Sequence, residues 1–146
     1  MSGSEALVRR YMAAIPADFA TLGELRHPDF VEEWPQSGER IRGHENSRRI
    51  HERYPGVATL HGEVRGITGA EDRWVLSPTL APLRIEGTGD TYTVESIATY
   101  PDGSKWFVIA ILKLQDGKVL RARTYWAAPF EAPAWRAEWV ERMERS

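Results

Sequence analysis

The sequence predicts an α+β domain in which helices come first, a mostly antiparallel sheet follows, and one helix closes the chain. Two observations predict this class. Apolar residues recur at helical spacing in the first part of the chain and again at its end, whereas the second half consists of apolar and β-branched segments separated by turn residues. Two of these turns contain Asp-Gly, which suits tight hairpins because glycine tolerates a positive φ.

Three helices are expected before the sheet. Pro16 separates the first two, and Asp18 is placed to cap the second. A third helix is expected over His44–Tyr54, and Pro55 with Gly56 ends it. The apolar stripes of the first two helices are Val8, Tyr11, Met12 and Ile15, then Phe19, Leu22 and Leu25.

The strands are expected in one early segment and six later ones. The early segment is Phe30–Trp34, and the later ones are Leu60–Ile67, Trp74–Leu76, Leu83–Ile85, Thr91–Tyr100, Trp106–Leu114 and Val119–Trp126. A closing helix is expected to begin at Pro133. It should dock through Trp135 and Trp139, because a terminal helix normally buries one face.

Composition excludes several classes of protein. At 146 residues the chain fits one domain, 1–146. A balance of 19 basic and 21 acidic residues offers no basic patch for nucleic acid or anionic membranes. The chain has no cysteine, which excludes disulfides and thiol nucleophiles, and we expect a cytoplasmic protein because no apolar signal core is visible.

Two motifs resemble a known family. Asp29-Phe30-Val31-Glu32-Glu33-Trp34-Pro35 with Ser37-Gly38-Glu39-Arg40-Ile41-Arg42-Gly43 looks like its first strand and turn, and Leu114-Gln115-Asp116-Gly117-Lys118-Val119 with Thr124-Tyr125-Trp126 looks like its last hairpin. In this order they resemble the SnoaL-like branch of the nuclear transport factor 2-like superfamily, across nearly the whole chain. The resemblance implies a cone-shaped, curved sheet, antiparallel or mixed, wrapped around N-terminal helices, an apolar cavity, and often a homodimer formed through the sheet.

Strand alternation separates two faces of the closing meander. If its two hairpin loops have equal length, Glu95 and Arg123 share one face, and the opposite face carries Tyr92, Val94, Ser96, Ala98, Tyr100, Leu120, Ala122, Thr124 and Trp126. In isomerase-like relatives, the positions that match Ala122 and Trp126 face the ligand. The resemblance therefore implies that the apolar face is the cavity wall, and that Glu95, Arg121, Arg123 and Tyr125 form the outer surface or a dimer contact.

A competing interpretation makes Glu95 a buried general base that Arg123 steers. The charged row would then line the interior, and the apolar row would lie outside. Charged rows on half-exposed sheets are more often solvated pairs, which favours the first arrangement.

The acid and base residues of known relatives are missing here. Isomerase-like relatives have an Asp base before the Pro of the first turn, where this chain has Trp34, and an acid near Ile109 or Ile111. Relatives that resemble limonene epoxide hydrolase have an Asp at the position of Thr124, and polyketide cyclase relatives have one near Ala127 and Ala128. The resemblance therefore does not supply a reaction.

Other residues near the implied cavity form the candidate site. Either Glu32 or Glu33 points inward, and that carboxylate with Tyr11 as proton donor would make an acid–base pair. The alternative is a solvated Glu and a core Tyr. The candidate ligand-binding residues are Trp34, Tyr92, Ser96, Tyr100, Thr124 and Trp126.

Two functions remain open, and neither needs a cofactor. His44 and His51 could share a helix face, but no third ligand stands at metal-site spacing. The leading hypothesis is a small-molecule domain, either a SnoaL-like lyase, isomerase or hydrolase acting on a compact apolar ligand or a carrier. The alternative is a non-catalytic dimerisation domain whose cavity its own side chains fill.

Overall fold

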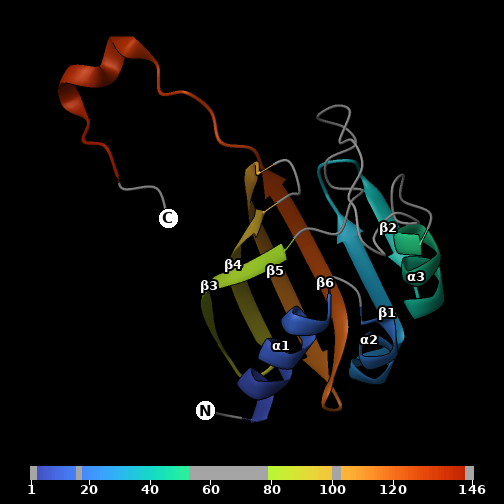
Figure 1. Cartoon of the computed structure of the whole chain (residues 1–146). Coiled ribbons are helices and arrows are strands. Elements are labelled where there is room, and N and C mark those ends of the chain that lie inside the picture. The colour runs from blue at the N-terminus through green and yellow to red at the C-terminus, as the bar shows by residue number, and fades with distance from the viewer. Residues whose placement is uncertain (1–2, 16–17, 53–78, 100–102, 144–146) are drawn as a thin grey trace.

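The fold was obtained as a computed structural model, which describes residues 3–15, 18–52, 79–99 and 103–143 (Figure 1). The strands expected over Leu60–Ile67 and Trp74–Leu76 lie outside these residues, as does Tyr100. The described residues form three α-helices, six strands and one short 3₁₀ helix. The α+β class is confirmed.

The helices follow the expected pattern. They are α1 (Gly3–Ala14), α2 (Phe19–Leu25) and α3 (His44–Glu52). Asp18 caps α2, because its carboxylate accepts hydrogen bonds from the backbone N–H of Thr21 at 3.1 Å and from its hydroxyl at 2.7 Å. None of the helices in the described ranges is long and apolar enough to cross a membrane.

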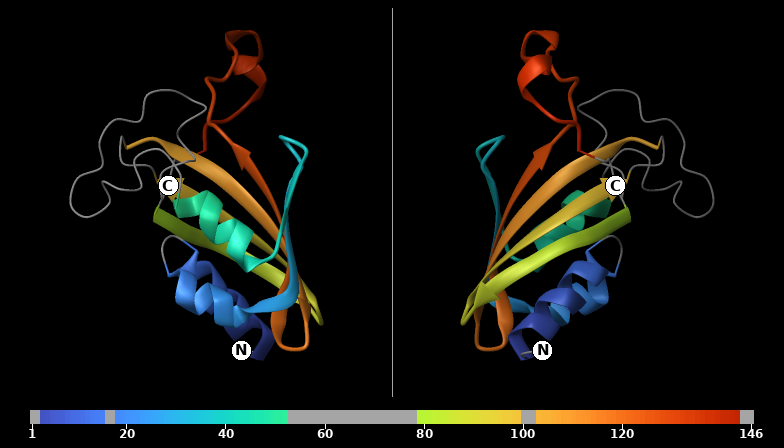
Figure 2. Two further views of the ribbon diagram at one scale, coloured as in Figure 1. Left: turned by 90° about the vertical axis from the view of Figure 1, so that its right-hand side faces the viewer. Right: turned by 90° about the vertical axis from the view of Figure 1, so that its left-hand side faces the viewer.

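The six strands form one curved, open sheet. They are β1 (Arg26–Trp34), β2 (Glu39–Arg42), β3 (Thr79–Thr88), β4 (Thr91–Thr99), β5 (Lys105–Gln115) and β6 (Lys118–Ala127), in the order β2-β1-β6-β5-β4-β3. Only the β1–β6 pair is parallel among these neighbours. Figure 2 shows α1, α2 and α3 on the same side of the sheet, which we call the inner face.

The hydrophobic core lies between the inner face and the helices. Helix α1 contributes Val8, Tyr11 and Met12, and β1 contributes Phe30. The meander strands present alternate residues to this core, namely Tyr92 and Val94 from β4, Ala110, Leu112 and Leu114 from β5, and Val119 and Ala122 from β6. The core thus fixes which side chains of β1 and β6 face the helices.

The two meander loops differ in length, contrary to the equal lengths considered from the sequence. Thr99 pairs with Lys105, and Gln115 pairs with Lys118 across a two-residue turn. A bulge at Leu120 shifts the β5–β6 register, so that Lys113 pairs with Arg121. Val119, and not Leu120, is buried because it pairs with the buried Leu114, and the bulge allows Ala122 to face inward as well.

The C-terminal segment differs from the expectation. It forms a 3₁₀ helix, η3 (Ala134–Trp139), that begins after Pro133. Trp135 and Trp139 do not dock, because they are 74% and 73% exposed. The described part of the chain therefore gives the tryptophan stripe no apolar surface to cover it, and Figure 1 shows η3 standing away from the sheet.

Candidate functional site

The candidate site begins with the alternation of β1. Phe30 is 1% exposed and lies in the core, so Glu32 and Trp34, two and four residues later, point to the inner face as well. The register agrees, since Glu32 lies beside the buried Ala122 of β6 and the buried Ile41 of β2. Glu32 is therefore the inward carboxylate of the pair.

Two hydrogen bonds hold the Glu32 carboxylate. The indole Nε1–H of Trp34 donates to Oε1 at 3.1 Å, and the hydroxyl of Ser47 donates to Oε2 at 3.3 Å. Ser47 lies on α3 and is fully buried. One donor from the strand and one from the helix orient the carboxylate.

Glu33 points the other way. Arg40 donates two hydrogen bonds to its Oε2, and Arg123 donates two to its Oε1, at 3.0–3.2 Å. These arginines, Arg40 foremost, lower the pKa of Glu33 below its ordinary value. Glu33 is thus the centre of an ion-pair cluster on the outer face and lies apart from Glu32.

A buried arginine lies beneath the inward residues. Arg26, at the start of β1, is 5% exposed and its guanidinium stacks over the Phe30 ring at 4.3 Å. Its Nε–H donates to the Tyr11 hydroxyl oxygen at 3.3 Å, and its Nη1 lies 3.0 Å from Nδ1 of His44. The cation thereby joins α1 to α3 under the inner face.

Arg26 determines which nitrogen of the His44 ring carries the proton. Arginine has no acceptor, so Nδ1 of His44 accepts and the ring's proton lies on Nε2. Burial, and then the charge of Arg26, lower the pKa of His44, which favours this neutral ring. The ring packs closely on α2, since a Cβ at Gly23 would lie 3.1 Å from Nε2.

Tyr11 is a protonated phenol with a defined orientation. Burial raises its pKa to about 12, and the charge of Glu32 also raises it, while Arg26 opposes both effects. Because the phenol oxygen accepts from Arg26, its own proton is available for a hydrogen bond in another direction. Tyr11 can therefore donate a hydrogen bond on the same side as Glu32.

Aromatic rings border the carboxylate. Trp34 and Trp126 meet edge to face, with ring centroids 5.6 Å apart. Gln36 fixes the end of β6, because its side-chain amide donates to the Trp126 carbonyl at 2.7 Å and accepts from the Trp126 N–H at 2.6 Å. The Trp34 ring thus lies beside Glu32, and the Trp126 ring packs against Trp34.

Two hydroxyl groups lie further along the inner face. Ser96 is 1% exposed, and its Oγ has no hydrogen-bond partner among the described residues. Thr124 is also buried, and Tyr92 belongs to the core cluster. A buried hydroxyl without a partner is unfavourable unless another group satisfies it, so Ser96 offers a polar contact on an otherwise apolar wall.

The remaining predicted residues take their places on the outer face. Arg123 lies there with Glu33, and Glu95, Arg121 and Tyr125 are exposed on the same side. The neighbours of Glu95 across the sheet are Ile109 and then Tyr125. Ile109 and Ile111 also face outward. The inward positions of β5 are Val108, Ala110 and Leu112, so the place of the relatives' acid is one residue away from the positions considered from the sequence.

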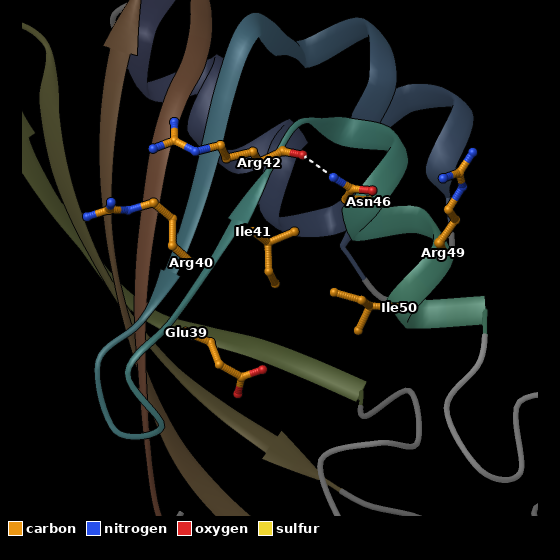
Figure 3. Close-up of a pocket in the computed structure, with 7 residues that line it drawn as sticks. All are labelled: Glu39, Arg40, Ile41, Arg42, Asn46, Arg49 and Ile50. Atoms are coloured by element: carbon orange, nitrogen blue, oxygen red, sulfur yellow. Dashed lines mark hydrogen bonds between the residues drawn. The ribbon is translucent and has the colours of Figure 1, made fainter.

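A separate pocket of about 610 Å³ lies between β2 and α3 (Figure 3). Ile41 and Ile50 form its apolar part, and Asn46 donates a hydrogen bond to the Arg42 carbonyl at 2.8 Å. In Figure 3 the Arg40 and Arg42 side chains extend away from this apolar part. Glu32 and Tyr11 do not line this pocket, so it is distinct from the inward group.

Three residues of the inward group escaped the sequence interpretation, namely Arg26, Ser47 and His44 in its role beside Arg26. Arg26 precedes His27 and Pro28, which suggested a turn, whereas β1 already begins at Arg26. Ser47 had no signal beyond its place on a helix. Among the described residues, no three His, Asp or Glu side chains come together as a metal site would require.

Comparison with known proteins places the chain among related folds. The profile of one family, described as the SnoaL-like domain, matches residues 8–122. No curated protein sequence matches the chain. The crystal structure of an NTF-2-like protein of unknown function from Burkholderia xenovorans is 26% identical, with a TM-score of 0.73, and the alignment covers 97% of this chain and 96% of that one.

Two further crystal structures show the same fold. A protein from Kribbella flavida, provisionally described as a ketosteroid isomerase, is 24% identical with a TM-score of 0.75, and the alignment covers 98% of this chain and 91% of that one. An LEH-like epoxide hydrolase from M. tuberculosis is 17% identical with a TM-score of 0.60, and the alignment covers 85% of this chain and 82% of that one. At these identities the similarity concerns the fold alone.

Proposed function

The chain belongs to the SnoaL-like domain family, and from this membership we propose that it binds a compact, largely apolar molecule on the inner face of its sheet and moves a proton on it. The observation that carries the proposal is the inward Glu32 carboxylate, held by Trp34 and Ser47. A carboxylate fixed in place beside an aromatic ring is equipped to act as a general base.

The proposed step is proton abstraction next to a carbonyl group. Glu32 takes the proton from carbon, and the electron pair moves onto the carbonyl oxygen as an enolate forms. The Tyr11 hydroxyl donates a hydrogen bond to that oxygen, and Arg26 supports the phenol by donating to it. Where the ketone carries a β,γ C=C bond, the enolate is a dienolate, and return of the proton to the γ carbon shifts that bond into conjugation and completes an isomerisation.

The apolar wall determines which molecules fit. Trp34 and Trp126 supply flat apolar surface, and Ser96 with Thr124 supplies the few polar contacts that orient a ligand. Such a wall favours a ring-sized ketone over a charged metabolite. Glu39, the cross-strand partner of Trp34, stands on the same face but is exposed, so Glu32 alone is proposed to serve both proton transfers.

Relatives support this chemistry by analogy. Glu32 lies two residues before Trp34, the position where isomerase-like relatives have their base, and both side chains face inward. Two residues correspond to roughly 7 Å along a strand. We propose that the base has moved by this distance, with Tyr11 in place of the acid missing from β5.

Hydrogen–deuterium exchange on small ketones tests the base. We expect the protein in D₂O to exchange α-protons of cyclohexanone or 1-indanone, followed by NMR. Glu32→Gln should lower the exchange rate about 100-fold or more, because general bases contribute roughly 10²–10⁴-fold. Glu33→Gln, one residue away on the opposite face, is the matched control and should change the rate less than about 2-fold, within the range expected away from the reacting groups. Equal effects of both substitutions would exclude Glu32 as the base.

The alkaline limb of the pH profile tests Tyr11. Because its pKa is raised to about 12, the exchange rate should stay level through pH 10, where an ordinary phenol loses its proton. Tyr11→Phe should lower the rate without weakening ketone binding, measured by quenching of tryptophan fluorescence. A decline centred at pH 10 would contradict a buried phenol donor.

The alternative function is a non-catalytic dimerisation domain. Exposed apolar side chains on the outer face of the sheet favour it. Native mass spectrometry separates the two functions, because a copurified or added ketone should appear on the protein only if the inner face is open. Absence of both ketone binding and proton exchange would leave assembly as the function.

A further inference from the structure

The outer face of the sheet carries two neighbouring cross-strand rows of arginine. In the first row Glu33 of β1 lies between Arg40 of β2 and Arg123 of β6. Each arginine donates two hydrogen bonds to one carboxylate oxygen, Arg40 to Oε2 and Arg123 to Oε1. Two arginines that stand two strands apart therefore reach one anion on the strand between them.

The second row repeats the arginines without the anion. Two residues earlier on β1, Val31 lies between Arg42 of β2 and Arg121 of β6. Alternation puts these side chains on the same face as the first row. Figure 3 shows the Arg40 and Arg42 side chains extending to the same side of β2. The position that a carboxylate occupies in the first row is thus apolar in the second.

The two arginines of the second row retain most of their hydrogen-bonding capacity. Within the described ranges, the Arg42 guanidinium makes no ion pair and no hydrogen bond. Arg121 approaches only the Glu33 Oε1, and its Nε lies 3.9 Å from that oxygen, which is too long for a hydrogen bond. Lys113, the next residue in this row, is paired with Asp90 at 2.6 Å. Two exposed positive charges therefore remain in this row without a hydrogen-bonded carboxylate from the described part of the chain.

A hollow of about 400 Å³, which we call the Val31 hollow, lies at the second row. Val31 and Leu120 supply its apolar lining, and Arg42 and Arg121 are among its cationic residues. Asp29 also lines it, but this side chain is 86% exposed and lies 4.0 Å from His27. The volume lies in the range of small-molecule sites, so a charged group with a small organic group attached to it can fit.

We propose that the Val31 hollow binds a small phosphate monoester, with the phosphate held between Arg42 and Arg121 as Glu33 is held in the first row. A phosphate monoester has a charge of about −1.5 to −2 at pH 7 and three strong acceptor oxygens, so it can accept from an arginine on each side. The planar guanidinium is suited to such bidentate contacts. The site lies on the opposite face from Glu32 and does not rest on the chemistry proposed there.

Charge and lining distinguish this ligand from other anions. A dianion matches the two positive charges of the row, whereas a monocarboxylate matches one of them. Contact with Val31 and Leu120 favours an organic ester over inorganic phosphate, because the ester buries apolar surface. The chain as a whole has a formal charge of −2, which disfavours a long polyanion.

Calorimetric titration of the full chain with phenyl phosphate at low ionic strength tests the site. We expect saturable binding that Arg42→Gln and Arg121→Gln each weaken about 10-fold, because hydrogen bonds to charged groups are the stronger kind. Arg84→Gln is the matched control. Arg84 is an exposed arginine paired with the outward Glu95 at the other end of the sheet, and its loss should change the affinity less than about 2-fold. Equal effects of all three substitutions would overturn the proposal.

Val31→Glu tests where the phosphate lies. The new carboxylate would stand between Arg42 and Arg121 as Glu33 stands between its own arginines, so it should weaken phenyl phosphate binding about 10-fold or more. Val31→Gln, of the same size without the charge, should keep the affinity within about 3-fold. Circular dichroism and thermal unfolding should show both variants folded. Unchanged binding by a folded Val31→Glu variant would place the anion elsewhere and contradict the proposal.

Other probes test the class of ligand. Phenyl phosphate should bind more tightly than inorganic phosphate, which lacks the apolar group, and than diphenyl phosphate, which has a single charge. Glu32→Gln, on the inner face, should leave this binding unchanged even if it abolishes proton exchange. The absence of saturable phenyl phosphate binding below about 10 mM would overturn the site. Tighter binding of inorganic phosphate, diphenyl phosphate or a short single-stranded oligonucleotide would overturn the assignment to a monoester.

Discussion

Arg26 is a buried cation whose hydrogen-bond partners are neutral. A tyrosine hydroxyl and an imidazole accept its hydrogen bonds, and a phenylalanine ring lies against its guanidinium plane. Aromatic faces attract cations, and arginine loses less hydration on burial than lysine. The cation therefore fixes the Tyr11 oxygen and the His44 Nδ1 as hydrogen-bond acceptors.

Protonation of His44 should weaken the fold. Its pKa in the folded chain is lowered from about 6.5, so the unfolded chain binds the proton more tightly. The free energy of unfolding should consequently fall as pH drops below about 6.5, because a protonated ring would face Arg26 with no acceptor. Urea unfolding between pH 7.5 and 5.5 measures this.

His44→Gln is the informative variant. The glutamine amide oxygen can still accept a hydrogen bond from Arg26, but the glutamine side chain does not titrate. Its stability should vary less over the same interval. Glu33 does not interfere, because its lowered pKa confines its own loss of stability to pH values below its ordinary 4.5. An unchanged slope in the variant would assign the pH dependence to other groups.

At this scale the sequence identified Glu32 and Tyr11 as candidates but not the residues that hold them. Alternation alone left Glu32 and Glu33 equivalent, and only the buried Phe30 and Ile41 distinguish them. The Arg26–His44 contact joins residues 18 positions apart on different elements. Such a contact has no local signal because tertiary packing creates it.

The elements of the meander show how a loop and a bulge offset each other. The connection between β4 and β5 has an odd number of residues, whereas the turn between β5 and β6 has two. Together these loops would place Glu95 and Arg123 on opposite faces. The extra residue Leu120 restores the alternation. The shared face predicted from equal loops is therefore present, for a different reason.

The β5–β6 turn depends on Gly117. Asp116 and Gly117 both have positive φ, 53° and 72°, as a type I′ turn requires. Gly117→Ala should lower the free energy of unfolding by about 1 kcal/mol, because a side chain is strained at this φ. Thermal or urea unfolding provides the measurement.

Gly3→Ala is the matched control, since Gly3 has open space around it and an ordinary helical conformation. It should leave stability unchanged or raise it slightly. A loss as small in Gly117→Ala as in Gly3→Ala would mean that the turn relaxes into another type.

Element identity was largely predictable from local pattern, and the exceptions are β2, which was not expected as a strand, and the C-terminal segment 128–143. Helices α1 and α2 and strands β4, β5 and β6 follow from periodicity and turn chemistry. The tryptophan stripe has the same helical spacing, yet it forms a 3₁₀ helix with exposed rings. Sequence period predicts an apolar face but not the surface that covers it.

The strand pairing between the residues most distant in sequence is that of β1 with β6. Strand β1 pairs in parallel with β6, with Glu32 beside Ala122 and Glu33 beside Arg123, whereas β3 to β6 are joined by local hairpins. Contacts distant in sequence have the larger loop-closure cost and tend to form late. We expect the meander to fold before β1 docks.

Folding kinetics of point variants measure this order. Phe30→Leu on β1 should mainly accelerate unfolding, whereas Leu112→Ala on β5 should mainly slow refolding. Stopped-flow tryptophan fluorescence over a range of urea concentrations separates the two rates. The opposite assignment would place β1 docking in the folding nucleus.

The two hydrogen bonds between the Gln36 side chain and the Trp126 backbone limit further strand pairing at the end of β6. From Val31 to Glu33, strand β1 pairs with β6 at a constant offset, and Gln36 stands at the position that would meet Trp126 had β1 continued in this register. Its side-chain amide offers the donor and the acceptor that a peptide group would offer. The last backbone hydrogen-bonding positions of β6 are thus occupied by a side chain, which offers no further backbone groups for pairing. A strand of another protein therefore cannot pair with this end of β6.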